Sequence, residues 1–257
     1  MEVLKKEEDK IVFRMSGVSP AFANMLRREI IESVPVMAVE DVEFRENSSA
    51  LYDEVLAHRL GLIPLITDLK SYTLPAKCKC GGEGCARCQV KLVLKAKGPC
   101  TVYASDIKSK DPNVRPVYPK MIVAKLLKSQ EIELEATAVL GQGKDHMKFA
   151  SGLAFYHSDF EFKQSRKLDN ADEIARKCPA GVFKAENGKL VPLDESKSDL
   201  YESCLEFAPQ DAVSVREIPG SVIFTVESWG QISPKEMLVE GCESFISQID
   251  EFEGLFK

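Results

Sequence analysis

The pattern that most constrains the fold lies in the last part of the chain. Apolar residues recur there at alternating spacings of four and three, at Leu238, Cys242, Phe245, Ile249, Phe252 and Phe256. A mean period of 3.5 residues predicts one seam along a coiled-coil-like helix. Ser233, Pro234 and Glu236 are typical of a capping box that starts a helix. Burying an aromatic ring is worth roughly 2–3 kcal/mol, so we expect the chain's own core or a second polypeptide to cover this seam.

A second amphipathic helix is predicted near the other end of the chain. Ser19 and Pro20 suit the first positions of this helix, and the helix is expected to end before Pro35. Arg27 and Arg28 lie off its apolar stripe, which consists of Phe22, Met25, Leu26 and Ile30.

The middle of the chain is predicted to be rich in strands. Residues 90–97 and 131–136 alternate apolar and charged side chains, as half-buried antiparallel strands do. Strands are also expected at 36–44 and 222–227, and a short helix at 48–60. Residues 164–211 are more polar and contain a hairpin signal around Asn187-Gly188, so we interpret them as a small inserted module.

Composition narrows the function classes. The chain has 257 residues, enough for two or three modest domains, and a formal net charge of −6. An acidic balance argues against strong direct binding to nucleic-acid phosphates, which needs clustered Lys and Arg. The longest apolar runs are too short to span a membrane, and the first residues lack the apolar core of a signal peptide. We therefore expect a cytoplasmic protein.

Four of the eight cysteines crowd into one loop, at Cys78, Cys80, Cys85 and Cys88. Zn²⁺ prefers four thiolates in tetrahedral geometry, and short glycine-rich spacers let one loop surround the ion. The pattern therefore favours a structural zinc site with no open position for chemistry. The alternatives are free thiols or disulfides formed during handling.

Several blocks along the chain resemble the RNA polymerase alpha family. The first runs from Ser19 to Arg28 and ends in Ser33-Val34-Pro35, and the second is Leu56-Ala57-His58-Arg59-Leu60-Gly61-Leu62-Ile63-Pro64-Leu65. The others are Asp145-His146-Met147-Lys148-Phe149, Gly152-Leu153-Ala154-Phe155-Tyr156 and Glu227-Ser228-Trp229-Gly230. The archaeal branch of this family, the D-type polymerase subunits, is the nearest likeness, because the module at 164–211 looks like their ferredoxin-like insertion.

This resemblance implies an α+β fold with a discontinuous dimerisation domain. That domain comprises residues 1–41 and 212–257. A β-rich domain at 42–163 interrupts it and carries the zinc-type loop 78–88, and a degenerate ferredoxin-like module occupies 164–211. The eukaryotic relatives carry a similar zinc loop, whereas the bacterial relatives lack one.

The resemblance also implies a non-catalytic assembly role in transcription. In the family, the first and last helices pack against a smaller partner, subunit L in archaea, and the heterodimer is a platform for the large catalytic subunits. The apolar stripe and the seam would then form the partner interface, and Arg27 and Arg28 would dock a large subunit. Packing on the chain's own core, and a solvated basic face, are the alternative interpretations.

The insertion resembles a ferredoxin that has lost its clusters. Aligning the C-x2-C-x2-C-x3-C-P motif on Cys178-Pro179 and on Ala208-Pro209 leaves cysteine at only two of eight ligand positions, Cys178 and Cys204. The other six are Leu168, Ala171, Ile174, Ser198, Tyr201 and Ala208. We therefore expect no iron–sulfur cluster. Cys178 and Cys204 fall around the same lost cluster, so they are predicted to form a disulfide or to lie as neighbouring buried thiols.

Two other function classes compete with the assembly subunit. A ferredoxin-like electron carrier is disfavoured by the missing ligands, and a zinc-dependent DNA-binding module by the acidic charge. The sequence contains no closely spaced aspartate triad like the magnesium site of a polymerase, so we expect catalysis to reside in other subunits.

Overall fold

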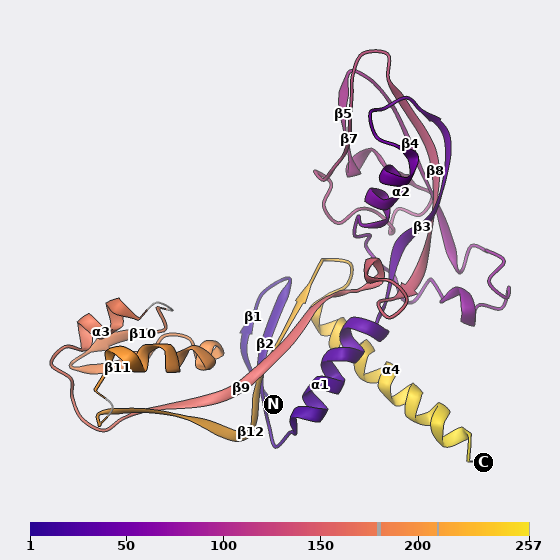
Figure 1. The fold of residues 1–257 in the computed structure, drawn as a ribbon. Coiled ribbons are helices and arrows are strands. Elements are labelled where there is room, and N and C mark those ends of the chain that lie inside the picture. Colours follow the sequence, from indigo (N-terminus) through magenta and orange to yellow (C-terminus); the bar gives the residue numbers. More distant parts are fainter. Residues whose placement is uncertain (179–180, 210, 257) are drawn as a thin grey trace. The chain divides into compact units, whose positions relative to one another are not determined.

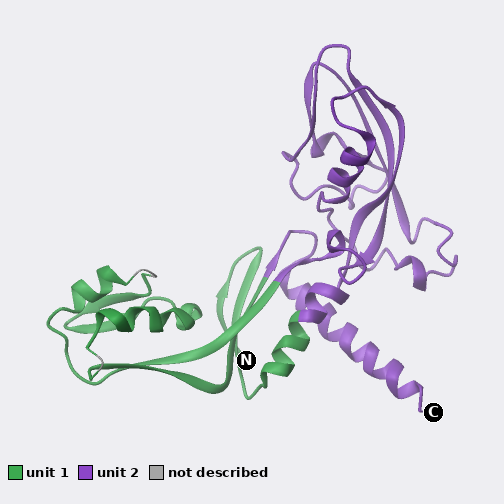
Figure 2. Ribbon diagram, viewed as in Figure 1, with its two compact units in different colours: residues 1–27, 154–226 green, residues 28–153, 227–257 purple. Residues whose placement is uncertain are grey.

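The computed structural model of the chain describes residues 1–178, 181–209 and 211–256. Pro179 of the predicted motif and Lys257 of the predicted dimerisation domain lie outside these residues. The chain forms two compact units, one from residues 1–27 and 154–226 and the other from 28–153 and 227–257 (Figure 2). Both mix helix and strand, which is compatible with the predicted α+β class. The units divide the chain at other points than the predicted domains, whose boundaries stay a prediction.

The first unit contains an antiparallel hairpin within a larger sheet. The strands are β1 (Glu2–Lys6), β2 (Lys10–Ser16), β9 (Gly152–Gln164) and β12 (Val213–Ser228), in the order β1-β2-β12-β9 (Figure 1). Buried Phe13 of β2 stacks on buried Phe224 of β12, with ring centroids 5.4 Å apart. On the same sheet, Arg14 donates to the buried carboxylate of Asp159 at 2.8 Å. A buried carboxylate needs such partners, so this pair ties β2 to β9.

The segment between β9 and β12 has a core of its own. It contains α3 (Ala171–Lys177), β10 (Phe183–Glu186), β11 (Lys189–Pro192) and the 3-10 segment η5 (Glu195–Phe207). The predicted hairpin is confirmed: β10 pairs with β11 through Asn187 and Gly188, whose φ angles of 54° and 79° are those of a tight hairpin turn.

The second unit holds the other long sheet. Its strands are β3 (Pro35–Asn47), β8 (Glu131–Gln142), β4 (Gln89–Lys97) and β6 (Lys108–Ser109), paired in the order β3-β8-β4-β6. A two-stranded sheet of β5 (Cys100–Tyr103) and β7 (Ile122–Leu126) lies in the same unit, with short 3-10 turns at η2 (Pro75–Lys77), η3 (Ala104–Asp106) and η4 (Met147–Phe149). Along β4, Val90, Leu92 and Leu94 are buried, so the predicted alternation is confirmed.

The helix expected at 48–60 is shorter in the structure. The helix α2 spans Asp53–Gly61. Upstream, the Ser49 N–H donates to the Asn47 side-chain oxygen at 3.1 Å, and the Asn47 amide donates to the Leu51 carbonyl at 2.9 Å. These local side-chain bonds offer the backbone an alternative to helix, which corrects the predicted start.

The two terminal helices form largely as predicted. The first is α1 (Pro20–Arg28), which continues as a π-helical turn, η1 (Glu29–Ser33), and the Ser19 hydroxyl accepts from the Phe22 N–H at 3.2 Å. The last is α4 (Pro234–Gly254), whose capping box between Ser233 and Glu236 is confirmed. Within the described part of the chain, no helix combines the length and apolar character needed to cross a membrane.

Candidate partner interface and metal centre

One side of α4 presents apolar side chains to solvent. Ile246 is 56% exposed, Ile249 48% and Phe252 62%. We call this side the outer strip; it consists of Val239, Cys242, Ile246, Ile249, Phe252 and Phe256, all of them exposed. Phe252 and Phe256 pack edge to face with ring centroids 5.0 Å apart, so part of the apolar surface is ordered within the helix itself. The strip is an apolar surface that the described residues of the chain leave uncovered.

The opposite side of α4 packs within the second unit, against η1. Met237 and Gly241 are buried, and a Cβ at Gly241 would lie 3.1 Å from Ile30 Cγ1 of η1. About two turns further on, the Gln248 amide donates to the Glu29 carboxylate at 2.9 Å. This close approach fixes how the helix is rotated and therefore which residues remain outside.

The rotation of α4 means that the exposed side of the helix is not identical to the predicted seam. Leu238 and Phe245 of the seam are half-buried. Val239 and Ile246, which were not predicted, lie on the exposed side. Val239 and Ile246 are seven residues apart, and this spacing could have predicted a second apolar line beside the seam.

An acidic stripe runs beside the outer strip. It consists of Glu236, Glu240, Glu243 and Asp250, and the last three each follow an outer-strip residue directly in sequence. Burial, together with the carboxylates of Glu243 and Glu236, raises the pKa of Glu240 above its ordinary value.

The predicted interface on the first helix is smaller than expected. Ile30 is fully buried and Leu26 is 7% exposed, so the structure corrects their assignment to a partner surface. Ile30 is used by the packing of α4, as described above. Phe22 is 46% exposed and Met25 is half-buried, which leaves these two apolar side chains accessible.

The two arginines differ in their surroundings. Arg27 donates to the Asn24 side-chain oxygen, at 3.2 Å from Nε and 3.0 Å from Nη2. Arg28 forms an exposed ion pair with Glu32 at 3.0 Å. Exposed pairs of this kind contribute little to stability, so both guanidinium groups can exchange these contacts for an external acid.

The four clustered cysteines converge on one point. The sulfur pairs Cys78–Cys85 and Cys80–Cys88 are each 3.6 Å apart, Cys78–Cys80 is 3.4 Å and Cys85–Cys88 is 3.8 Å. Four sulfurs bound tetrahedrally at about 2.3 Å from Zn²⁺ would be about 3.8 Å apart. The residues therefore fit a tetrahedral metal site, and the cluster is compatible with zinc.

Backbone groups of the loop act on the thiols. Hydrogen bonds of the Cys80 sulfur with the Gly84 N–H, with the Cys78 side chain and with the Gly82 N–H lower the pKa of Cys80 to about 6. The positive φ angles of Gly82 (88°) and Gly84 (95°) make this approach possible. Burial raises the pKa of Cys88 to about 11. Cys80 is thus ready to ionise, whereas Cys88 needs a nearby cation to do so.

Comparison with known proteins gives full-length matches. The chain is 35% identical to DNA-directed RNA polymerase subunit Rpo3 of Methanosarcina acetivorans, over 98% of this chain and 96% of that protein. It is 36% identical to the Rpo3 of Pyrococcus horikoshii over 99% of both chains, and 38% identical to that of Methanothermobacter thermautotrophicus over 93% of this chain and 92% of that one. Residues 42–153 match the family model of the RNA polymerase Rpb3/RpoA insert domain. The chain belongs to the Rpo3 family.

Membership of the Rpo3 family bears out the resemblance to alpha-like polymerase subunits. The matched insert-domain residues form most of the second unit, including the cysteine loop, the two-stranded sheet and all of the larger sheet except the first half of β3. The insertion at 164–211 lies outside that match.

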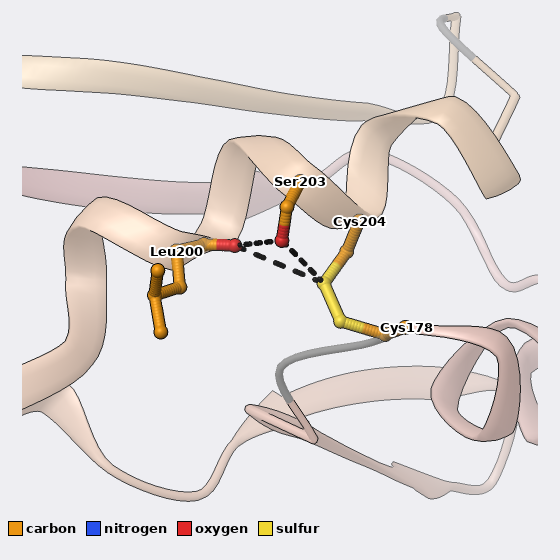
Figure 3. The surroundings of a disulfide bond; sticks show 4 residues. All are labelled: Cys178, Leu200, Ser203 and Cys204. Carbon is orange, nitrogen blue, oxygen red and sulfur yellow. Dashed lines mark hydrogen bonds between the residues drawn. A yellow bond between two sulfur atoms is a disulfide. The ribbon is translucent and has the colours of Figure 1, made fainter.

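In this Rpo3-family chain, the insertion joins its two cysteines. The sulfurs of Cys178 and Cys204 are bonded to each other, with Cα atoms 5.0 Å apart (Figure 3). Other positions of the predicted motif lie in the same core: Leu168, Ala171, Ile174 and Tyr201 are at most 3% exposed. Apolar side chains therefore fill the interior at positions where the motif would place cluster ligands.

Proposed function

We propose that the chain is a non-catalytic assembly-platform subunit of a cytoplasmic DNA-dependent RNA polymerase. In this proposal it forms a heterodimer with a smaller subunit L and docks the large catalytic subunits. The observation that carries the proposal is the outer strip of α4, which remains exposed in a chain that belongs to the Rpo3 family. An apolar surface of this kind marks a site for another protein.

The charge beside the strip favours a different polypeptide over a second copy. In a symmetric pair of identical chains, the same patch lies on both sides of the interface. In an antiparallel pair of α4 helices, Glu240, Glu243 and Asp250 would then approach carboxylates of the same stripe on the second copy, and like charges across an interface oppose association. A partner with an apolar face flanked by Lys or Arg fits the strip and the stripe together.

Two substitutions test the heterodimer. Ile246→Asp with Ile249→Asp places charge on the exposed strip without touching the buried side of α4. Each isoleucine is worth about 2 kcal/mol when buried, so we expect about a thousandfold loss of affinity for purified subunit L. Leu127→Asp, at a side chain that is 61% exposed outside α4, is the control. A complex of unchanged affinity, measured by calorimetry, would reject the interface.

We also propose that Arg27 and Arg28 dock a large subunit. Both can release their local acceptors, Asn24 and Glu32, at little loss of stability. Arg27→Glu with Arg28→Glu should preserve the one-to-one complex with subunit L and prevent it from binding a large subunit in gel filtration. Replacing both by Lys, which keeps the charge, should restore part of the binding.

The cysteine loop is proposed to hold Zn²⁺ through Cys78, Cys80, Cys85 and Cys88. Bound zinc supplies positive charge and links four points of a loop that has little core of its own. With all four ligands from the protein, the site has a structural role. The insertion is proposed to be a degenerate ferredoxin-like module, and the predicted dimerisation domain, 1–41 with 212–257, is part of the same proposal.

A further inference from the structure

Two cavities adjoin the cysteine loop. The smaller has a volume of about 360 Å³ and includes Cys85 in its lining, and the larger has about 590 Å³ and includes Cys88. Gly84 and Gln89 are the two residues that line both cavities. They therefore form part of the boundary between two spaces that adjoin the metal-type cluster.

The Gln89 side chain lies directly over Gly84. A Cβ placed on Gly84 would be 2.7 Å from Gln89 Oε1 and 2.8 Å from both Cδ and Nε2 of the same side chain. The whole amide group, rather than one of its atoms, thus packs against the bare Cα. Gly84 also has a φ of 95°, which favours glycine. Glycine at this position therefore permits both the turn of the loop and the place of the Gln89 amide.

The covered glycine supports the cysteine cluster. The Gly84 N–H forms a hydrogen bond with the Cys80 sulfur. Groups of this kind around a metal site orient its ligands and influence how tightly the metal is held. Gln89 also follows Cys88 directly in sequence, and Cys88 is 1% exposed. The side chain of Gln89 thus lies against the support of one sulfur and next to the most buried cysteine of the cluster.

The backbone of Gln89 is fixed without help from its side chain. Gln89 is the first residue of β4 and lies opposite Val139 of β8. Its N–H and that of Cys88 donate to the Cys85 carbonyl, at 3.1 Å and 3.0 Å. In the part of the chain that the structure describes, the side-chain amide has no hydrogen-bond partner. Its contact with Gly84 is therefore one of packing, made from a rigid strand end.

We propose that Gln89 is a cover for the metal centre of the cysteine loop. Its side chain holds Gly84 where the Gly84 N–H reaches Cys80, and it keeps competing metal ligands away from the sulfurs. Gln89 is a positioning residue, because it acts through Gly84 and is not itself a ligand. The inference rests on the proposed zinc site and adds a residue that slows the exchange of the metal.

Metal release to a coloured chelator tests the cover. Full-length chain is loaded with Zn²⁺, and transfer of the ion to pyridylazoresorcinol is followed by absorbance. Gln89→Ala removes the amide, so we expect about tenfold faster release. Glu83→Ala shortens an exposed side chain of the same loop and is the matched control, with release at the parent rate. Release from Gln89→Ala at the parent rate would overturn the inference.

A conservative variant separates packing from amide chemistry. Methionine has nearly the length and volume of glutamine but no amide group. Because the contact with Gly84 is one of packing, Gln89→Met should release Zn²⁺ within about twofold of the parent rate. Release as fast as that from Gln89→Ala would show that the amide acts by hydrogen bonding, against the proposed cover.

Cobalt absorption separates loss of the cover from loss of a ligand. Co²⁺ bound by four thiolates gives intense charge-transfer and visible bands. We expect Gln89→Ala loaded with Co²⁺ to keep the bands of the parent, because all four cysteines remain in place. Bands of a centre with fewer thiolates would show that the substitution disrupts the site itself, and the role of a cover would be wrong.

The same measurements distinguish the cover from the zinc site on which it depends. If the parent chain binds neither Zn²⁺ nor Co²⁺ through four thiolates, the proposed zinc site and the role of Gln89 fail together. If the parent holds the metal and Gln89→Ala loses it no faster, the zinc site stands and only the role of Gln89 is rejected.

Discussion

The cysteine loop at 78–88 and the insertion at 164–211 are organised by opposite means. In the loop, Cys88 is the one buried residue, and four sulfurs occupy the centre where a core would otherwise be. In the insertion, a core that includes Phe183, Leu190 and Tyr201 occupies the centre, and two sulfurs remain as a disulfide. Both are small, and a small module requires either a core or cross-links.

The difference teaches that a small module is ordered by what fills its centre. In the insertion aromatic rings pack there: Phe183 lies 5.1 Å from Tyr201 and 4.5 Å from Phe162 of β9, measured between ring centroids. The loop has no comparable apolar residues, so its order depends on the four sulfurs and what they bind.

Removing the metal should have the largest effect and should act on the loop alone. Apparent binding free energies for structural zinc are on the order of 10 kcal/mol. We expect zinc-loaded protein to become sensitive to proteolysis within 78–88 after treatment with a strong chelator, while the insertion stays resistant. Mass spectrometry of the fragments measures this. Identical cleavage with and without chelator would show that the loop is ordered without metal.

Removing a core aromatic should be the largest change available in the insertion. Tyr201 is 3% exposed, and Tyr201→Ala should destabilise the module by about 4 kcal/mol, since it removes a packed ring. Hydrogen exchange of residues in α3 and β10 would report the loss, with exchange in the cysteine loop unaltered. Tyr201→Phe, which keeps the ring, serves as the matched control.

Breaking the disulfide should have a smaller effect than losing the ring. The two cysteines are 26 residues apart, for which the loop-closure model gives about 3.5 kcal/mol. Cys204→Ser should lower the unfolding free energy of the insertion by about that amount and make it insensitive to reductant. If reductant leaves the stability of the parent protein unchanged, the pair exists as neighbouring thiols in solution.

The smallest effect is expected at a cysteine outside both regions. Cys100 is exposed and bonds weakly to the Lys97 carbonyl, at 3.5 Å. Cys100→Ser should change stability by less than about 0.5 kcal/mol and leave zinc content unaltered. A loss of zinc on this substitution would mean that the metal site extends beyond the four clustered cysteines.

Features set by neighbouring residues were predictable. The Asn187-Gly188 turn, the alternation of β4 and the capping box at Ser233 each depend on interactions within a few positions, and all three are confirmed. The convergence of Cys78, Cys80, Cys85 and Cys88 follows from short spacers for the same reason. The predicted start of α2 was wrong because the Asn47 side chain hydrogen-bonds to a backbone group that a helix would otherwise use. Apolar periodicity does not report this effect.

The sequence by itself therefore determined the elements, the cysteine cluster and the existence of an apolar terminal helix. Only the tertiary structure decided which side of that helix is covered, because Gly241 packs on Ile30, more than two hundred positions earlier in the chain. The same packing removed Ile30 from the predicted interface and left Ile246 exposed. Local hydrogen bonds depend on residues that are close in sequence. The burial of a side chain depends on which residues the tertiary fold packs against it.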